Sequence, residues 1–272
     1  MSTNKILIQV FSDIHIELWN KFPRLPVKSK YLILAGDIGQ LNHTSFNQFL
    51  EYVSINWEKV FYIPGNHEFY SHEKNMNLLE LEYKSCFDMY KNIFYLNNSF
   101  IELDDQINIY GAVFWTIPPF SSTYEAQMYV NDYNHISYSK TDTNEVVPLD
   151  ILRVKELSEQ SFINLQEYLT GVNKKTIIVT HFPPHQSGTS HPKYRLQGKV
   201  MKNYFGHPDD LLNRFENLSN VLCWISGHTH YSYDFITPEG IRLISNQLGY
   251  RNEAVSKDTN FNQDGLYEIN VS

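Results

Sequence analysis

Residues 59–68 of the chain are KVFYIPGNHE, an apolar run followed by a polar turn. The run is short, rich in β-formers and closed by Pro64, so it predicts a buried strand that ends at residue 63. Asn66 offers a carbonyl oxygen to a metal ion, and His67 can carry a proton near neutral pH. Gly65 is expected to let the backbone turn sharply enough to aim both side chains at one point.

Four other stretches have the same layout, an apolar run followed by Asp or His. These runs cover residues 6–11, 31–35, 176–180 and 221–225, and each predicts a strand. In an open α/β sheet, side chains at the carboxyl ends of the strands converge on one edge. The side chains expected to surround one cavity are Asp13, His15, Asp37, Asn66, His181, His228 and His230.

Composition indicates one large globular domain over residues 1–272, since 42% of the residues are hydrophobic and 15% are aromatic. The net charge of −8 argues against duplex nucleic acid or an anionic membrane as the main partner. No signal peptide is expected, and no apolar run approaches the ~20 residues of a membrane span. The two cysteines, Cys86 and Cys223, are expected to be free thiols, so a cytoplasmic location is predicted.

The order of elements predicts two stacked mixed β-sheets that form a sandwich flanked by helices, an α/β (α+β) fold. Helices are expected at residues 44–55, 72–90 and 149–169, and a short one from residue 208. Residues 117–147 are polar, rich in Tyr and weakly periodic, which fits either an excursion over the site or a surface insertion. The remaining strands are expected at residues 93–96, 100–103, 107–115, 231–237, 241–245 and 265–271.

Seven ligands of carboxylate, imidazole and carboxamide type are too many for one metal ion. Two ions about 3.5–4 Å apart that share one carboxylate would use all of them. Such a pair lowers the pKa of a bound water and neutralises the oxygens of a phosphoryl group during in-line attack. Oxygen ligands beside nitrogen ligands, without thiolates, suit this chemistry.

The motifs D-x-H, G-D, G-N-H-E, a lone His after a strand and G-H-x-H occur in this order over residues 13–230. In this arrangement the chain resembles the calcineurin-like metallophosphoesterase superfamily. The resemblance implies a two-sheet sandwich and a hydrolase of phosphate esters that uses a metal-bridging hydroxide. It implies two divalent cations, expected to be Mn²⁺, with Fe, Zn, Co and Ni as alternatives.

The resemblance also implies a role for each residue. One metal would take Asp13, His15, Asp37 and His230, and the other would take Asp37, Asn66, His181 and His228. His67 matches the acid of the family, which protonates or stabilises the leaving group. The alternative for His67 is a purely supporting role, since no Asp is visible to hold it, although Glu17 and Glu68 are possible partners of ligating histidines.

Differences from known subfamilies leave the substrate open. The protein phosphatase motif G-D-x-V-D-R-G is replaced by Gly36-Asp37-Ile38-Gly39-Gln40, and Pro64 precedes Gly65, so both phosphate-gripping arginines of that subfamily are missing. Gln40 also stands where purple acid phosphatases have a Tyr ligand. Bacterial-type phosphoesterases are more similar. The substrate is expected to be a small phosphorylated molecule, either a phosphomonoester or a phosphodiester.

The loop of residues 182–208 leaves directly from His181 and contains several cationic side chains. Arg195 can grip a phosphate with two parallel hydrogen bonds, and His191 is the second candidate for substrate binding. The alternative is a solvated loop whose charges only aid solubility.

A second class of function is a catalytically inactive metallophosphoesterase-fold module for protein interaction. Relatives of that kind lose a metal-binding His or the catalytic His. Every one of these positions is filled in this chain, which favours the enzyme.

Overall fold

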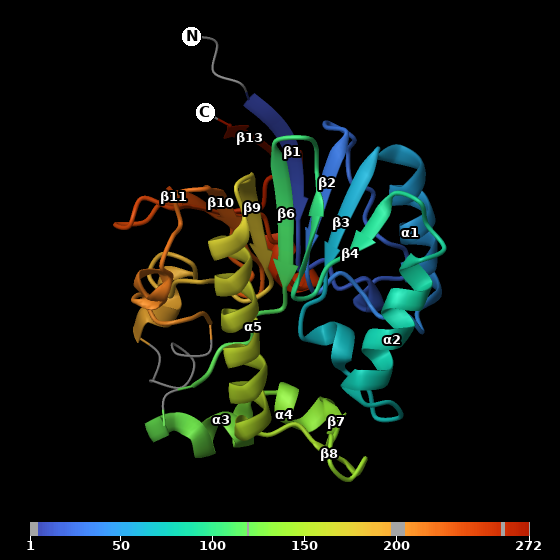
Figure 1. The fold of residues 1–272 in the computed structure, drawn as a ribbon. Coiled ribbons are helices and arrows are strands. Elements are labelled where there is room, and N and C mark those ends of the chain that lie inside the picture. Colours follow the sequence, from blue (N-terminus) through green and yellow to red (C-terminus); the bar gives the residue numbers. More distant parts are fainter. Residues whose placement is uncertain (1–4, 119, 197–204, 257–258, 272) are drawn as a thin grey trace.

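Two β-sheets packed face to face form the centre of the computed structural model, which describes residues 5–118, 120–196, 205–256 and 259–271 (Figure 1). The first sheet has the strand order β13-β1-β2-β3-β4, in which β1 to β4 are parallel and β13 is antiparallel to β1. The strands are β1 (Lys5–Phe11), β2 (Tyr31–Ala35), β3 (Lys59–Ile63), β4 (Ile93–Tyr95) and β13 (Leu266–Asn270).

The second sheet has the order β11-β12-β10-β9-β6-β5. Four of its strands, β6, β9, β10 and β12, are parallel, while β5 and β11 are antiparallel to their neighbours. The strands are β5 (Ser99–Glu102), β6 (Ile107–Ala112), β9 (Lys175–Thr180), β10 (Val221–Ile225), β11 (Tyr233–Ile236) and β12 (Arg242–Ser245). The predicted fold class, two stacked mixed sheets flanked by helices, is confirmed.

Side chains from both sheets meet in one buried cluster between them, for example Val10 and Ile33 of the first sheet and Ile177 and Ile225 of the second. Gly111 of β6 sets how closely the sheets approach. A Cβ atom at this residue would lie 2.5 Å from Cβ of Leu96 and 2.9 Å from Cγ1 of Ile63. Only a residue without a side chain fits in that space.

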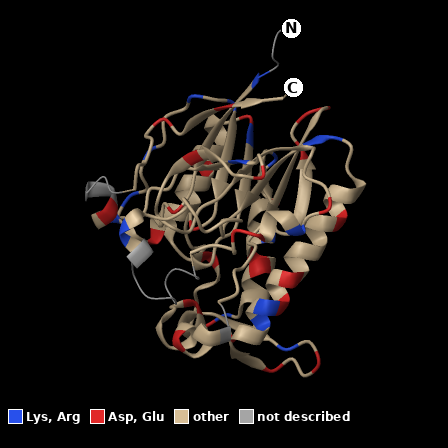
Figure 2. Cartoon of the chain, turned by 90° about the vertical axis from the view of Figure 1, so that its left-hand side faces the viewer, with Lys and Arg blue, Asp and Glu red and all other residues tan. Residues whose placement is uncertain are grey.

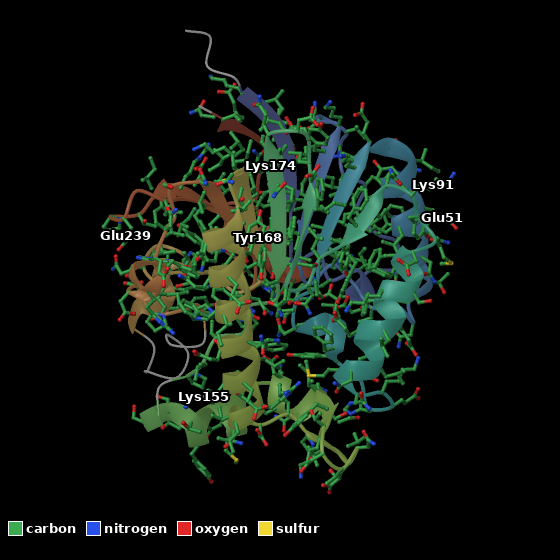
Figure 3. The ribbon with its side chains drawn as sticks, in the orientation of Figure 1. Glu51, Lys91, Lys155, Tyr168, Lys174 and Glu239 are labelled. Atoms are coloured by element: carbon green, nitrogen blue, oxygen red, sulfur yellow. The ribbon has the colours of Figure 1, made fainter. Side chains whose placement is uncertain are left out.

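Helices cover the outer faces of the sandwich. Figure 1 shows α1 (Thr44–Asn56) and α2 (Met76–Phe87) beside the first sheet and α5 (Ile151–Gly171) across the second. Tyr168 of α5, labelled in Figure 3, accepts a hydrogen bond from Asn108 of β6 and lies 3.0 Å from Oγ1 of Thr176 in β9. Among the described residues, no helix has the length and apolar character needed to cross a membrane.

Most predicted elements lie within a few residues of their observed bounds. The α2 helix begins at Met76 and not at residue 72, because the side chain of Asn75 caps it by accepting a hydrogen bond from the Leu78 N–H. The short helix expected from residue 208 is a 3₁₀ turn, η5 (Leu211–Arg214). A terminal helix, α7 (Arg251–Ser256), was not predicted.

Residues 117–118 and 120–148 form short helices and a hairpin. They contain η3 (Phe120–Ser122), α3 (Thr123–Tyr129), α4 (Asp132–His135) and a hairpin of β7 (Ser137–Ser139) and β8 (Val146–Pro148). Figure 1 shows α3, α4 and the hairpin at the lower end of the molecule, beyond the carboxyl ends of the central strands. Of the two interpretations of this segment, the excursion toward the site therefore agrees with the structure.

The close approach at Gly111 predicts a difference between two glycines. Gly111→Ala is expected to lower the free energy of unfolding by about 1–3 kcal/mol, because the added methyl group overpacks the space between the sheets. Gly171→Ala is the control, since no heavy atom lies within 4 Å of its Cβ position, and its effect should be neutral or slightly stabilising. Urea denaturation measures both, and equal midpoints for Gly111→Ala and the wild type would contradict the packing argument.

Candidate metal centre and active site

The candidate ligands lie at the carboxyl ends of parallel strands from both sheets. Asp13 follows β1, Asp37 follows β2 and Asn66 follows β3, whereas His181 follows β9 and His228 follows β10. Potential ligand atoms lie within 4.8 Å of one another in three overlapping clusters. The clusters are Asp13 with His15 and His230, His15 with Asp37 and His67, and Asp13 with Asp37 and His181.

The other two predicted ligands lie at the edge of these clusters. Oδ1 of Asn66 is 2.9 Å from Nε2 of His181, so its carboxamide faces the same point. His228 is outside the three clusters, with its ring centroid 5.2 Å from that of His181. Burial, together with the nearby His181, holds the pKa of His228 well below its usual value, so its imidazole is neutral, as a metal ligand must be.

Outer hydrogen bonds orient three of the imidazole rings. Nδ1–H of His15 donates to Glu17 (3.2 Å), Nδ1–H of His230 donates to Glu253 (2.6 Å), and Nδ1–H of His181 donates to the Ala35 carbonyl (3.0 Å). Each Nε2 atom therefore points into the cluster. Metal-binding histidines in proteins are oriented in this way.

Among the residues that the structure describes, the cationic partners of the two central carboxylates are histidines. Asp13 and Asp37 are buried, and within the described chain they form no ion pair with Lys or Arg. Burial acts to raise the pKa of Asp37, but His181 and His67 outweigh burial and hold it well below its usual value. Oxygen and nitrogen donors around buried carboxylates suit divalent cations, so the residues present fit a metal centre.

The backbone at the site is held in a conformation that side chains disfavour. Five of the nine non-glycine residues with positive φ among those described are predicted ligands, with φ between 50° and 74°. These five are Asp13, His15, Asp37, His228 and His230.

The motif glycines make room for ligands from other strands. A Cβ atom at Gly36 would lie 2.2 Å from Nδ1 of His181, and one at Gly65 would lie 2.2 Å from Oδ1 of Asp37. Gly65 does not have positive φ. The constraint that the structure shows at this glycine is therefore the close approach of Asp37.

Glu68 ties the loops after β2 and β3 together. Its buried carboxylate accepts hydrogen bonds from the N–H groups of Asp37 (3.0 Å), Ile38 (2.8 Å) and Gly65 (2.7 Å), and from the Tyr62 hydroxyl (2.7 Å). Burial and the charge of Asp37 raise the pKa of Glu68 to about 7. Glu68 thus fixes the backbone that presents Asp37 and does not bind a ligating histidine.

His67 belongs to the cluster with His15 and Asp37, and it has a carboxylate partner that the sequence did not reveal. Its Nδ1 atom is 3.6 Å from Glu17, and its Nε2 atom is 4.0 Å from Asp37. Burial acts to lower the pKa of His67, but these two carboxylates outweigh burial and raise the pKa to about 9. Burial likewise acts to raise the pKa of Glu17, but hydrogen bonds with His15 and His67 lower it to about 2.

A cavity of about 250 Å³ opens at this centre. Its lining residues are Asp37, Asn66, His67, Tyr70, Tyr129, Val130, Asn131, Asp132, Tyr194, Phe205, His228, Thr229, His230, Tyr250 and Glu253. Several of them were not predicted from the sequence, above all Asp132 and Glu253. Residue spacing gave no signal for either, because each lies outside the motifs.

The two candidate substrate-binding residues lie on the loop after His181. His191 is not among the lining residues, and its ring centroid is 5.5 Å from that of Tyr231. Its Nδ1 atom accepts a hydrogen bond from the Lys193 N–H (3.0 Å). Arg195 belongs to the turn η4 (Pro192–Leu196), and its side chain lies outside what the structure describes.

Comparisons with known proteins agree with this geometry. A family model described as calcineurin-like phosphoesterase matches residues 6–232. Uncharacterized protein L509 of Acanthamoeba polyphaga mimivirus is 30% identical over 289 aligned positions, and the alignment covers 97% of this chain and 96% of that protein. The crystal structure of phosphopantetheinyl hydrolase from Mycobacterium tuberculosis has a similar fold, with a TM-score of 0.69 at 16% identity over 97% of this chain and 95% of that one.

Proposed function

The chain belongs to the calcineurin-like phosphoesterase family, and on this premise we propose that it hydrolyses phosphate esters with two divalent metal ions. The observation that carries the proposal is the position of Asp37, whose Oδ2 atom lies 3.9 Å from Nε2 of His15 and whose Oδ1 atom lies 3.4 Å from Nε2 of His181. One carboxylate between two groups of donors is what a pair of cations requires.

We propose that Asp13, His15, Asp37 and His230 hold one ion, and that Asp37, Asn66, His181 and His228 hold the other. Mn²⁺ is the proposed metal, with Fe, Zn, Co and Ni as alternatives. When bound, the two cations would supply a nucleophile at neutral pH and neutralise charge on the phosphoryl group. Glu17, Glu253 and the Ala35 carbonyl hold the Nδ1 atoms of three histidines, which leaves their Nε2 atoms available to bind the ions.

His67 is the proposed general acid. Its raised pKa keeps the imidazole protonated near pH 7, and the residue lines the cavity beside Asp37. A proton held there can pass to the leaving-group oxygen as the P–O bond breaks. Glu17 would then stabilise the orientation of His67 through the contact at Nδ1.

The proposed substrate is a small phosphorylated molecule, a monoester or a diester. A cavity of about 250 Å³ accommodates a compact ester, and aromatic side chains such as Tyr129, Tyr194 and Tyr250 surround it. Duplex nucleic acid is not a proposed partner. The net charge is −8, and on the face shown in Figure 2 the Lys and Arg positions are scattered among acidic ones. A single domain and a cytoplasmic location remain predictions.

Metal dependence is the first test of this function. Chelation followed by dialysis should abolish hydrolysis of p-nitrophenyl phosphate or its bis ester, and Mn²⁺ should restore it. Asp37→Asn should be the most damaging ligand variant, because one carboxylate would serve two cations. Asp105→Asn, at an exposed turn, is the control. Full activity of the wild type in excess EDTA would refute a metal mechanism.

The role of His67 can be separated from metal binding. His67→Gln should keep both ions while kcat falls by about 10²–10⁴, the usual contribution of a positioned acid. The loss should shrink for leaving groups of low pKa, which need little protonation. His43→Gln, at the N-cap of α1 and outside the motifs, serves as the control. An equal loss of kcat across leaving groups would assign His67 a supporting role only.

Substrate binding by the loop after His181 is tested by Arg195→Ala and His191→Ala. Both should raise KM and leave the metal content unchanged, because a cation on this loop would orient the phosphate from outside the metal centre. Steady-state kinetics with the best substrate measures the effect. Wild-type kcat/KM in both variants would exclude the loop as the clamp and direct attention to Tyr129 and its neighbours.

A further inference from the structure

We propose that the short helix α4 positions Asn66 and His67, with Asp132 as the residue that fixes the carboxamide of Asn66. The inference rests on the proposed metal function. Asp132 belongs to the segment of residues 117–147, outside every family motif, and only 2% of its surface is exposed. It lies 66 residues along the chain from Asn66, yet the two side chains are in direct contact.

The contact selects one of two orientations of the amide. Nδ2–H of Asn66 donates to Oδ1 of Asp132 (2.7 Å), and Oδ1 of Asn66 then faces His181 (2.9 Å from Nε2). The two ends of a carboxamide have nearly the same shape, but only the oxygen can bind a cation. Oδ1 of Asp132 accepts from both Asn66 and Tyr70, and an accepting oxygen pairs only with the nitrogen end of the amide, so Asp132 leaves the oxygen end of Asn66 for the metal.

Tyr70 extends the same restraint to His67. Its hydroxyl donates to the same oxygen of Asp132 (2.6 Å). Its ring stacks on His67, with centroids 4.2 Å apart and planes 24° apart, and also stacks on His135 of α4 at 5.2 Å and 27°. The Ser71 N–H donates to the His135 carbonyl (2.9 Å). One turn of helix thereby fixes both the metal-facing carboxamide and the plane of the proposed acid.

The geometry favours a positioning role for Asp132 over direct metal binding. Among the described residues, it belongs to none of the three clusters of potential metal ligands. One of its oxygens already accepts from both Asn66 and Tyr70. Partners of this kind typically change metal affinity or activity by 10–100-fold when removed.

Titration with Mn²⁺, followed by calorimetry and by the EPR signal of the coupled ion pair, tests the proposal without any substrate. Asp132→Ala should weaken at least one of the two Mn²⁺ sites by about 10–100-fold, because the freed amide can present its nitrogen to the ion. Asn134→Ala, exposed on the same helix, should bind Mn²⁺ as the wild type does. A folded Asp132→Ala variant that binds both ions with wild-type affinity would overturn the proposal.

Asp132→Asn covers the case in which the alanine variant does not fold. Its side chain has the same size, but its amide can accept from or donate to Asn66 and so no longer selects one orientation. We expect at least about a threefold loss of Mn²⁺ affinity, less than for alanine. An affinity equal to that of the wild type in this variant would also reject the proposal.

A double-variant cycle shows whether Asp132 acts through Asn66. In the Asn66→Ala background, the further change Asp132→Ala should cost no additional Mn²⁺ affinity, since there is no amide left to orient. Additive losses would identify Asp132 as an independent ligand and contradict the positioning role.

The stacking of Tyr70 on His67 is tested separately by kinetics. Tyr70→Leu should lower kcat most for poor leaving groups with both Mn²⁺ ions bound, and Tyr70→Phe, which keeps the ring, should restore most of it. A loss of kcat in both variants that is equal for all leaving groups would contradict the role of Tyr70 in positioning His67. A wild-type chain that binds no Mn²⁺ would refute the proposed function itself, whereas a wild type with two ions and an unaffected Asp132→Ala would refute only this inference.

Discussion

The structure depends on holding strained backbone at the carboxyl ends of its parallel strands. Five predicted ligands have left-handed φ values, which cost roughly 1–3 kcal/mol each for residues other than glycine. Such a conformation persists only when its surroundings restrain it. Glu68 restrains the loops after β2 and β3 by accepting hydrogen bonds from the N–H groups of Asp37 and Gly65. Asp13 links the two sheets by accepting a hydrogen bond from the His228 N–H. The fold and the site are thus stabilised by the same hydrogen bonds.

Much of this architecture could be predicted because its causes are local. Short β-rich runs closed by Gly or Pro gave the central strands of both sheets, and the apolar stripe of residues 44–55 gave α1. The site followed from one further rule, that ligands at the carboxyl ends of parallel strands converge. Spacing could not show why the motif glycines are needed. At Gly65 the reason is the carboxylate of Asp37, a residue on another loop.

Most contacts that support the site could not be predicted, because the partners are distant in sequence or carry no motif. Glu17 was a candidate partner of a ligating histidine and does bind His15, but its contact with His67 across 50 residues was not predicted. Glu253 contacts His230 from the unpredicted helix α7. Asp132 reaches Asn66 from a segment whose weak periodicity left its place open. In the sequence, a carboxylate in a polar segment cannot be distinguished from a solvent-exposed one, and only the fold shows which residues it contacts.

These supporting carboxylates also bear on the choice between an enzyme and an inactive module of the same fold. Glu17, Asp132 and Glu253 are buried or half-buried, and removing a charged group from water costs free energy unless it is well paired. Each contacts a proposed ligand or the proposed acid, at an atom that sets its orientation. A protein-interaction surface does not require a fixed tautomer of a buried histidine or a fixed orientation of a buried carboxamide. Orientation at this level is useful only to a centre that binds cations and transfers a proton, so the supporting residues favour the hydrolase.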